Sequence, residues 1–463
     1  TTVSGNASNP AVFNVVDLDR QQLLRSFPLP GAVSSWAHVR TPDGRVFIGA
    51  SNKMFVYSPQ TKEVTDLGEV IPAVGGGSIW ALTADDNGNV YGGTYPRGSL
   101  FRIDAATLQI TDMGQVDDGK APGDDGKPEQ YVRSLEYYNG FIYAGTGSSN
   151  GRVWKINPQT GEKVRIELPL PKTRPEYGGK YDAMGFCYGL KVVRNYLFAF
   201  FNGPFSMFVY DLDNERWLDV GFTNIRGLVA TTGEYDGKVY TAKKDGYLWE
   251  IDLETMTEKR FIPFDASLRS SAVLQLQNQP EFPNPTLVTL DYSGRAVLID
   301  SAGKKGYILS LVEGQAVNIQ SMETGPDGKL YMSGYPGGKG ASYSPITGEI
   351  ETFSLGQAEG MAALGDKMYF GLYPGGRIWE LDVNQPIQDG VNPKEIYKIP
   401  HQDRPFIMTP GDGKLFIGTI PDYGELGGSL TVYDPSLGPE QGFTVYEDVV
   451  HNQSIVGLAV RNG

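Results

Sequence analysis

The chain has few of the side chains that hold metals or act as nucleophiles. Its 463 residues include one cysteine, Cys187, and three histidines. One cysteine cannot form an internal disulfide, and no Cys and His residues stand at the spacing of a zinc site. A Walker A loop is absent as well. We therefore predict no Cys/His metal centre and no resident cofactor, and we expect Cys187 to be a small buried side chain.

Basic residues are also in short supply. Lysine and arginine number 40 against 54 aspartates and glutamates, which gives a formal net charge of -14. A surface of this sign does not favour nucleic acid, whose phosphates require a basic face, or an anionic membrane surface. No apolar run reaches the about 18 to 20 residues of a membrane-spanning helix. We predict neither nucleic acid nor membrane insertion.

Repetition is what the sequence has in abundance. Residues 88–104 return in altered form at 328–345 and 366–382. Each copy combines a turn containing glycine, an alternating strand and a second glycine-containing turn, which is a strong hairpin signal. Nine such copies are anchored at Gly44, Gly88, Gly140, Asn195, Gly237, Pro285, Gly328, Asp366 and Gly413. Their spacing of about 40 to 55 residues is typical of four-stranded propeller blades rather than of helical or leucine-rich repeats.

Each unit supplies four strands. An apolar strand such as 79–83 precedes the anchor turn, and two strands such as 100–103 and 108–110 follow the glycine-rich strand. The chain contains 59 glycines, 30 prolines and 26 tyrosines, and no long stretch shows helical periodicity with caps. The sequence predicts an all-β chain that forms a single β-propeller domain over residues 1–463.

The two ends of the chain complement each other. Residues 454–463 match the first strand of a blade and its turn, while 1–5, 11–19 and 23–29 match the second, third and fourth strands. We expect one blade to be shared between the N- and C-termini, which closes the ring and leaves no open sheet edge. The count is then about ten blades. Two smaller rings, or a ring with irregular blades, are the alternatives.

In this fold the first strands of all blades, and the loops that follow the second strands, surround one mouth of the central channel. Aromatic rings there suit the faces of sugars, and arginines suit hydroxyls and carboxylates. We predict substrate binding by six residues at this mouth: Trp36, Trp80, Tyr95, Arg97, Tyr188 and Arg226. For both tryptophans and for Tyr95, packing within the repeat is the alternative.

Three further residues are candidate catalytic groups. His38 lies on an inner strand where sister repeats carry Leu82 and Ser134. Tyr131 and Arg133 stand two positions apart, and therefore on one face of their strand. An arginine that points into a channel needs either an ion-pair partner or an anionic ligand. A packing histidine and a structural ion pair are the alternatives.

Carboxylates leave two other interpretations open. One insert carries four aspartates that would suit calcium, although without the spacing of an EF-hand: Asp117, Asp118, Asp124 and Asp125. A solvated loop is the alternative for this insert. Three acidic residues precede inner strands and would serve a glycoside hydrolase if two of them faced each other: Glu129, Asp182 and Asp403.

The repeat motifs, such as Pro42-Asp43-Gly44 and Tyr433-Asp434-Pro435, run through the whole chain, which resembles a family of bacterial extracellular propellers and, more loosely, the propeller-fold polysaccharide lyases. The lyase resemblance implies β-elimination on a uronate glycan. Arg133 would then pair with the carboxylate, His38 or Tyr131 would take the C5 proton, and a tyrosine would protonate the leaving oxygen. The resemblance also implies a secreted or cell-surface location, which the start at Thr1 without methionine favours.

Propellers carry unrelated functions, so the fold does not select among them. Our main hypothesis is an extracellular propeller that interacts with a polysaccharide or oligosaccharide, with lyase activity as its enzymatic form. The alternatives are a non-catalytic module that binds a glycan or a protein, and a glycoside hydrolase. A lyase requires His or Tyr beside Arg at the mouth, a hydrolase two facing carboxylates, and a binding module aromatic rings without a titratable pair.

Overall fold

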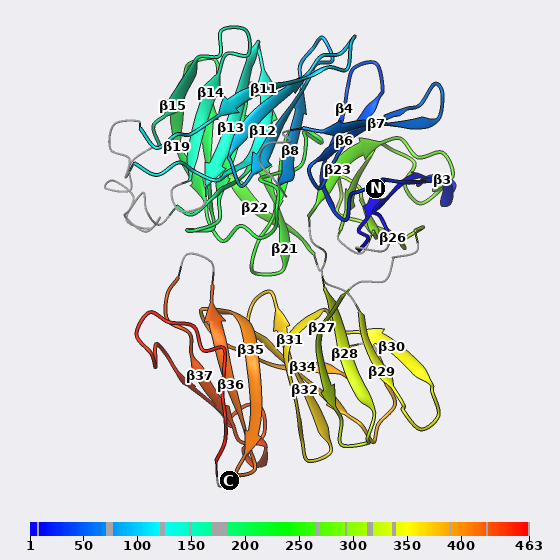
Figure 1. Ribbon diagram of the computed structural model, residues 1–463, viewed down its shortest axis with the longest axis vertical. Helices are drawn as coiled ribbons and strands as arrows, with labels where there is room; N and C mark the ends of the chain where they lie inside the picture. The colour runs from blue at the N-terminus through cyan, green and yellow to red at the C-terminus, as the bar shows by residue number, and fades with distance from the viewer. Residues whose placement is uncertain are drawn as a thin grey trace. The chain divides into compact units, whose positions relative to one another are not determined.

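The computed structural model describes residues 1–6, 9–70, 77–120, 126–147, 151–168, 184–264, 266, 268–291, 294–312, 318–335, 339–388, 390–422 and 425–461. Within these residues the chain forms ten antiparallel sheets and one short 3-10 helix, η5 (Pro435–Leu437). The chain divides into two compact units, Thr1–Gln315 and Ala316–Gly463 (Figure 1). Each unit is described by itself.

The first unit contains seven sheets, and in each of them consecutive strands pair in chain order. The first two sheets are β1 (Thr2–Val3), β2 (Val12–Asp17), β3 (Gln22–Pro28) and β4 (Ser35–Arg40), β5 (Val46–Ala50), β6 (Lys53–Ser58), β7 (Glu63–Glu69). The next two are β8 (Ser78–Ala84), β9 (Val90–Tyr95), β10 (Ser99–Ile103), β11 (Ile110–Gln115) and β12 (Tyr131–Tyr138), β13 (Phe141–Gly147), β14 (Arg152–Ile156), β15 (Lys163–Ile166). The last three are β16 (Cys187–Val193), β17 (Tyr196–Phe201), β18 (Ser206–Asp211), β19 (Arg216–Phe222), then β20 (Lys238–Ala242), β21 (Tyr247–Asp252), β22 (Glu258–Pro263), and β23 (Ser270–Leu274), β24 (Thr286–Leu290), β25 (Ala296–Ile299), β26 (Lys305–Ile308).

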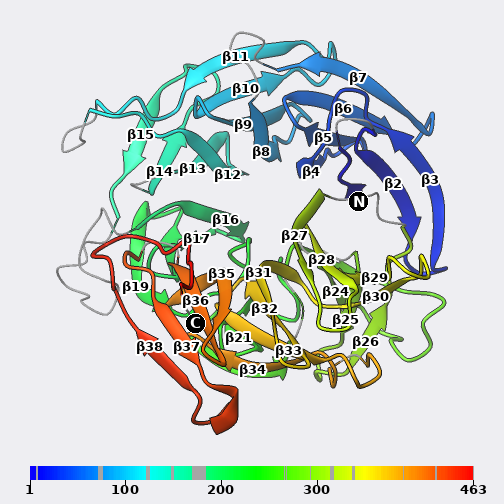
Figure 2. The same cartoon turned by 60° about the horizontal axis from the view of Figure 1, so that its bottom comes forward.

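These seven sheets follow one another around a ring, with β4, β8, β12 and β16 as inner strands that contact one another in turn (Figure 2). The ring of the first unit is closed by contacts between its first and seventh sheets. The Asp19 carboxylate accepts hydrogen bonds of 2.8 Å from the backbone N–H groups of Gln277 and Asn278. Leu18 also packs against the apolar cluster of the seventh sheet. Backbone donors and apolar burial therefore join the sheets that lie farthest apart in this unit's sequence.

Glycines in the second strands let neighbouring sheets approach closely. A Cβ atom added to Gly49 would lie 2.6 Å from Ile79 on the next inner strand, and one added to Gly145 would lie 2.7 Å from Cys187 Sγ. Gly93 holds the equivalent place against Val132. Cys187 is fully buried in this seam, as expected from the sequence. Such close packing fixes the depth at which each inner strand enters the ring.

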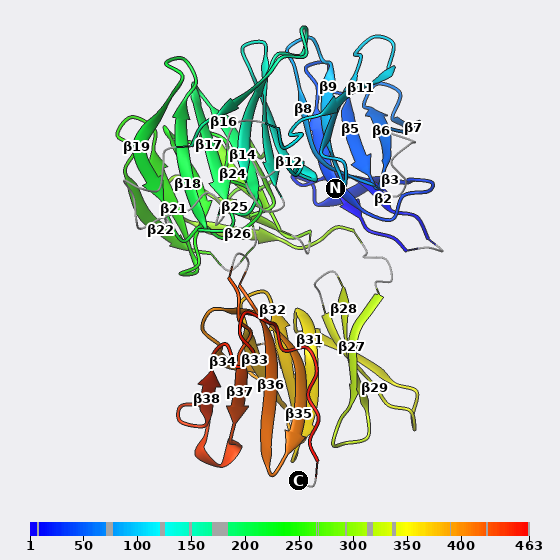
Figure 3. The ribbon, with the colours of Figure 1, turned by 60° about the vertical axis from the view of Figure 1, so that its left-hand side comes forward.

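The second unit contains three four-stranded sheets with the same order of pairing (Figure 3). Its strands are β27 (Asn318–Thr324), β28 (Leu330–Tyr335), β29 (Lys339–Tyr343), β30 (Ile350–Ser354), then β31 (Gln357–Leu364), β32 (Lys367–Tyr373), β33 (Arg377–Asp382), β34 (Lys394–Lys398), and β35 (Gln402–Gly411), β36 (Lys414–Pro421), β37 (Leu430–Tyr433), β38 (Phe443–Tyr446). The chain then continues along this unit, where Ile455 lies against Gly418. Ile455 thus repeats the contact of Ile79 with Gly49 in the first unit.

The all-β propeller class predicted from the sequence is confirmed, and the ten sheets agree with the predicted number of repeats. Strands β1, β2 and β3 also lie where the sequence predicted the last three strands of a blade. A blade shared between the termini is not observed: β1 pairs with β2, and the described residues 454–461 form no strand. Closure through a shared blade, and a single domain over residues 1–463, stay predictions.

Candidate functional site

A β-bulge recurs at the same place in four inner strands of the first unit. In β4, Ser35 faces Ala50 while Ala37 faces Gly49, so that Trp36 between them has no partner on strand β5. The same shift leaves one residue unpaired in each of three other strands, namely Trp80 in β8, Arg133 in β12 and Tyr188 in β16. A bulge re-aims a side chain out of the regular alternation of a strand. Four consecutive sheets therefore each extrude one residue.

The extruded side chains form one continuous stack. The rings of Trp36 and Trp80 have centroids 5.1 Å apart and planes inclined by 23°. The Arg133 guanidinium carbon lies 4.9 Å from the centroid of the Trp80 ring and 4.2 Å from that of Tyr188. At the other end, the Arg269 guanidinium lies 5.8 Å over the Trp36 ring and donates a hydrogen bond to the Trp36 carbonyl oxygen. We call these five residues the ladder.

Arg133 is the buried cation of the ladder. Only 7% of its surface is exposed. Its guanidinium packs against the two rings, and no described residue forms a hydrogen bond or ion pair with it. Arg97 differs, because it is exposed and pairs with Asp112 at 3.4 Å. The guanidinium nitrogens of Arg133 are not among the enclosed side-chain atoms that lack a partner, so they reach the surface, where an anionic ligand could accept hydrogen bonds from them. Arg133 is therefore the strongest candidate for contact with an anionic ligand.

A second aromatic group adjoins the ladder. The rings of Tyr95 and Tyr131 stack with centroids 4.0 Å apart, and Tyr131 meets the edge of Phe186 at 5.1 Å. Tyr131 is also 5.8 Å from Trp80. Burial, and then the neighbouring Tyr95, raise the pKa of Tyr131 to about 12. The hydroxyl of Tyr131 is therefore protonated at neutral pH, so it can act as a general acid but not as a general base.

His38 has different neighbours from Tyr131 and Arg133. Its Nε2 atom lies 2.6 Å from the Thr2 hydroxyl and 3.4 Å from the Ser35 hydroxyl, and its ring is 6.1 Å from Phe13. Although part of its side chain reaches water, the enclosing protein lowers the pKa of His38 to about 3, with help from the N-terminal amino group and from Arg269. His38 is thus neutral at physiological pH. Among the described residues, no hydrogen bond or ring contact joins it to Arg133 or Tyr131.

The structure brings most of the predicted binding residues together. Trp36, Trp80 and Tyr188 belong to the ladder, and Tyr95 adjoins it. Arg226 instead donates hydrogen bonds to the carbonyl oxygens of Phe264 and Ala266, at 3.3 and 2.7 Å, which ties segments of the backbone together.

Two residues of the site were not predicted from the sequence. Phe186 stands two positions before Tyr188, a spacing that could have indicated it. Arg269 directly precedes the strand β23, but no other feature of its repeat singles it out.

The structure describes two of the four aspartates of the calcium interpretation. Asp118 pairs with Lys120 at 3.0 Å, and Asp117 accepts a hydrogen bond from the Gly119 N–H, while Asp124 and Asp125 lie outside the described residues. No group of three or more His, Cys, Asp or Glu suited to a metal occurs in the described part of the chain. Calcium stays a prediction.

Each unit contains one described carboxylate of the hydrolase interpretation. Asp182 lies outside the described residues, and Glu129 and Asp403 belong to different units. The glycoside hydrolase alternative therefore stays a prediction.

In two sheets of the second unit the equivalent positions are polar, while the third has Phe406 there. The bulged residues of β27 and β31 are Gln320 and Glu359, and Gln320 donates to the Glu359 carboxylate at 2.7 Å. Arg404 pairs with the same carboxylate at 2.7 Å and lies 3.9 Å over the Tyr373 ring. This arginine therefore has an internal counter-ion, which Arg133 does not have among the described residues.

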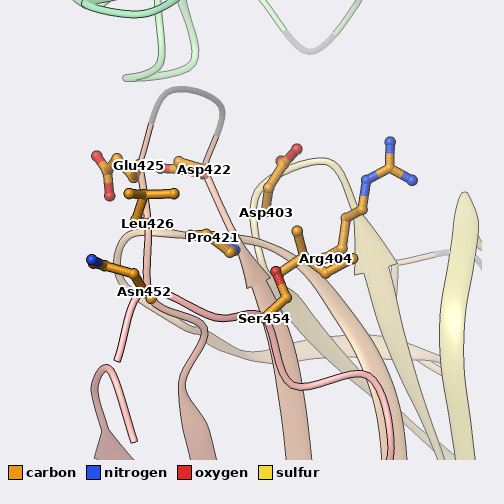
Figure 4. A pocket seen from close by; sticks show the side chains of 10 residues that line it. Asp403, Arg404, Pro421, Asp422, Glu425, Leu426, Asn452 and Ser454 are labelled. Carbon is orange, nitrogen blue, oxygen red and sulfur yellow. The ribbon is translucent and has the colours of Figure 1, made fainter. Parts of the chain in front are cut away.

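A hollow of about 250 Å³ also lies in the second unit, between the loop after β36 and the segment near Asn452 and Ser454 (Figure 4). Asp403, Asp422 and Glu425 contribute carboxylates to its lining. Asp403 accepts a hydrogen bond of 2.7 Å from the Gly375 N–H. The hollow contains none of the residues predicted from the sequence to bind substrate.

No protein-family model matches the chain, and no curated protein matches its sequence. Three of the solved structures that resemble it illustrate how low the sequence identity is. The computationally designed Ika8 protein is 15% identical with a TM-score of 0.42, over 76% of this chain and 92% of that chain. A chain of the Mitotic Checkpoint Complex is 13% identical with a TM-score of 0.45, over 66% and 89%. The WD40 β-propeller domain of Doa1 is 14% identical with a TM-score of 0.43, over 66% and 91%. These likenesses concern the fold alone. In the described residues no helix has the length and apolar character needed to cross a bilayer.

Proposed function

We propose that this chain binds an acidic glycan, a polysaccharide or oligosaccharide that contains uronate units, at the ladder of the first unit. The observation that carries the proposal is Arg133, which is 7% exposed, held between two rings, and without an ion-pair partner among the described residues. A uronate carboxylate would supply an anionic acceptor, and charge-assisted hydrogen bonds to a guanidinium are strong. The net charge of -14 would oppose long-range attraction of a polyanion, so recognition would be short-range.

The same residues favour binding over β-elimination. Elimination requires a base close to the C5 proton while an arginine holds the carboxylate. Tyr131 lies near Arg133, but its pKa is raised to about 12, so it is protonated at neutral pH. His38 is neutral, yet its pKa of about 3 makes it a weak base, and it hydrogen-bonds Thr2. We therefore propose a glycan-binding propeller, located outside the cell or at its surface, rather than a lyase.

The test compares an oligogalacturonate with its methyl ester, which has nearly the same shape but no charge. Calorimetric titration of the full chain should show that the acid binds at least about tenfold more tightly than the ester. Arg133→Gln should remove this preference, because its amide cannot form a charged bidentate pair. The ultraviolet absorbance of an unsaturated uronate product should not rise during incubation.

Arg97→Gln is the matched control. Arg97 is an exposed arginine of the same unit with a surface ion pair to Asp112, so its replacement should leave affinity unchanged. A wild-type chain that binds neither glycan, or an Arg133→Gln chain that keeps the acid preference, would overturn the proposal. A rise in product absorbance that disappears in Arg133→Gln would replace binding by β-elimination.

A further inference from the structure

Trp80 has ring neighbours from the sheets on both sides of its own. Its ring stacks with that of Trp36, from β4, with centroids 5.1 Å apart. From β12, the Arg133 guanidinium carbon lies 4.9 Å from the Trp80 centroid, and the ring of Tyr131 lies 5.8 Å away. Trp80 therefore joins the buried cation of the ladder to the aromatic residues around it.

The indole of Trp80 acts at this site through its ring. Its Nε1 atom is enclosed by protein, and no described residue accepts a hydrogen bond from it. A buried N–H group without an acceptor costs free energy, which a phenylalanine would avoid. What the indole offers in return is the aromatic face that attracts cations most strongly. Contact with the Arg133 guanidinium uses this property.

Trp80 is itself held in place. In β8, Ile79 faces Thr94 and Ala81 faces Gly93, so the bulge between them fixes the direction of Trp80. The Trp36 ring on its other side is fixed in turn, because Arg269 lies over that ring and donates a hydrogen bond to the Trp36 carbonyl oxygen. A side chain that is restricted in this way can orient the group that packs on it.

Orientation matters for Arg133 because a guanidinium recognises a carboxylate with two N–H groups in one plane. A long side chain loses rotamer freedom when it is ordered by a ligand, and this loss weakens binding. The rings of Trp80 and Tyr188, at 4.9 and 4.2 Å, already restrict the guanidinium in the folded chain. Part of the ordering is then complete before a carboxylate binds.

We infer that Trp80 determines the preference of this site for acidic over neutral glycans, as the residue that positions Arg133. Trp80 acts through the guanidinium and not by contact with the carboxylate. Without its aromatic face, Arg133 keeps its charge but loses its fixed direction. This inference rests on the proposed function and adds a residue that sets its specificity.

The test uses calorimetric titration of the full chain with the same oligogalacturonate and methyl ester. Trp80→Leu removes the aromatic face, so it should weaken binding of the acid about tenfold and leave binding of the ester unchanged. Trp80→Phe keeps an aromatic face and should weaken binding of the acid no more than about threefold. Trp80→Met, whose flexible side chain fills the space without an aromatic face, repeats the test if Trp80→Leu does not fold.

Trp154→Leu is the matched control. Trp154 is a buried tryptophan of β14 in the same unit, and its Nε1 atom also lacks an acceptor among the described residues. In that part of the chain, no ring or cation contact joins Trp154 to the ladder. Urea denaturation should show that both leucine variants are less stable than the wild type. Only Trp80→Leu should change the ratio of acid to ester affinity.

The outcomes separate this inference from the function on which it rests. A wild-type ratio in Trp80→Leu, with a loss of preference in Arg133→Gln, would overturn positioning by Trp80 and leave acidic-glycan binding in place. Equal weakening of acid and ester in Trp80→Leu would also overturn it, because the indole would then contact the sugar. The same loss of preference in Trp154→Leu would reduce the effect to general packing. A wild type that binds neither glycan would overturn both proposals.

Discussion

Trp36 and Trp80 occupy the same bulged position in successive sheets, and their rings stack 5.1 Å apart. The contact follows from repetition, because equivalent residues of neighbouring blades lie side by side on the inner strands. A different side chain at this bulged position changes the chemistry of the row of extruded residues, while the strands keep the same pairing. In the first unit the row continues with Arg133 and Tyr188, while in the second unit Glu359 holds the equivalent place.

Gly93 sets the position of Arg133. A Cβ atom at residue 93 would lie 2.7 Å from Val132 Cβ and 2.8 Å from the Val132 carbonyl oxygen, and Val132 immediately precedes the bulge. Gly93→Ala should therefore push β12 away, lower the free energy of unfolding by about 2 kcal/mol, and weaken glycan binding. Urea denaturation and calorimetric titration measure the two effects.

Gly233→Ala is the control for this prediction. A Cβ atom at residue 233 would have no heavy atom within 4 Å. This variant should keep wild-type stability and affinity. Equal stabilities of the Gly93 and Gly233 variants would show that the seam between the sheets accommodates a methyl group.

The repeats made the sheets predictable, because each hairpin carries its own glycine turn and alternating strand. The positions of Trp36, Trp80 and Tyr188 could be predicted as well, since they recur before the anchor turns. The bulges could not be predicted: a strand of regular period would place Tyr131 and Arg133 on one face, and only the register with β13 shows that Arg133 is extruded. The neighbours of each ring in the site come from the adjacent sheets, so they could not be predicted from the repeat that carries the ring.

His38 should make stability depend on pH. Its pKa is lowered from 6.5 to about 3 in the folded chain, so between these values the unfolded chain binds a proton that the folded chain does not. The free energy of unfolding should therefore fall as the pH is lowered from 6.5 towards 3. In His38→Gln the fall should be shallower over the same range. Urea titrations at a series of pH values measure both slopes, and equal slopes would contradict the assignment.

Glu359 should depend on Arg404 for its burial. The Glu359 side chain is fully buried, and its carboxylate accepts hydrogen bonds from Arg404 at 2.7 Å and from Gln357 at 2.6 Å. Removing one partner of a buried ion pair leaves an uncompensated charge, so Arg404→Met should destabilise the second unit by about 3 kcal/mol. Hydrogen exchange of the β31 and β35 amides is the suitable measurement, because two compact units need not unfold together.

The double variant Glu359→Gln with Arg404→Met tests the physical reason for this loss. The amide oxygen introduced by Glu359→Gln can accept from Gln357 or Gln320, and the new NH2 group can donate to the other glutamine once that side-chain amide turns its oxygen inward. The amide carries no charge that requires a cation. The double variant should therefore recover most of the protection lost in Arg404→Met, with a coupling of about 2 kcal/mol between the two positions. If the two effects simply add, the carboxylate is held by its neutral donors, and Arg404 contributes only its packing against Tyr373.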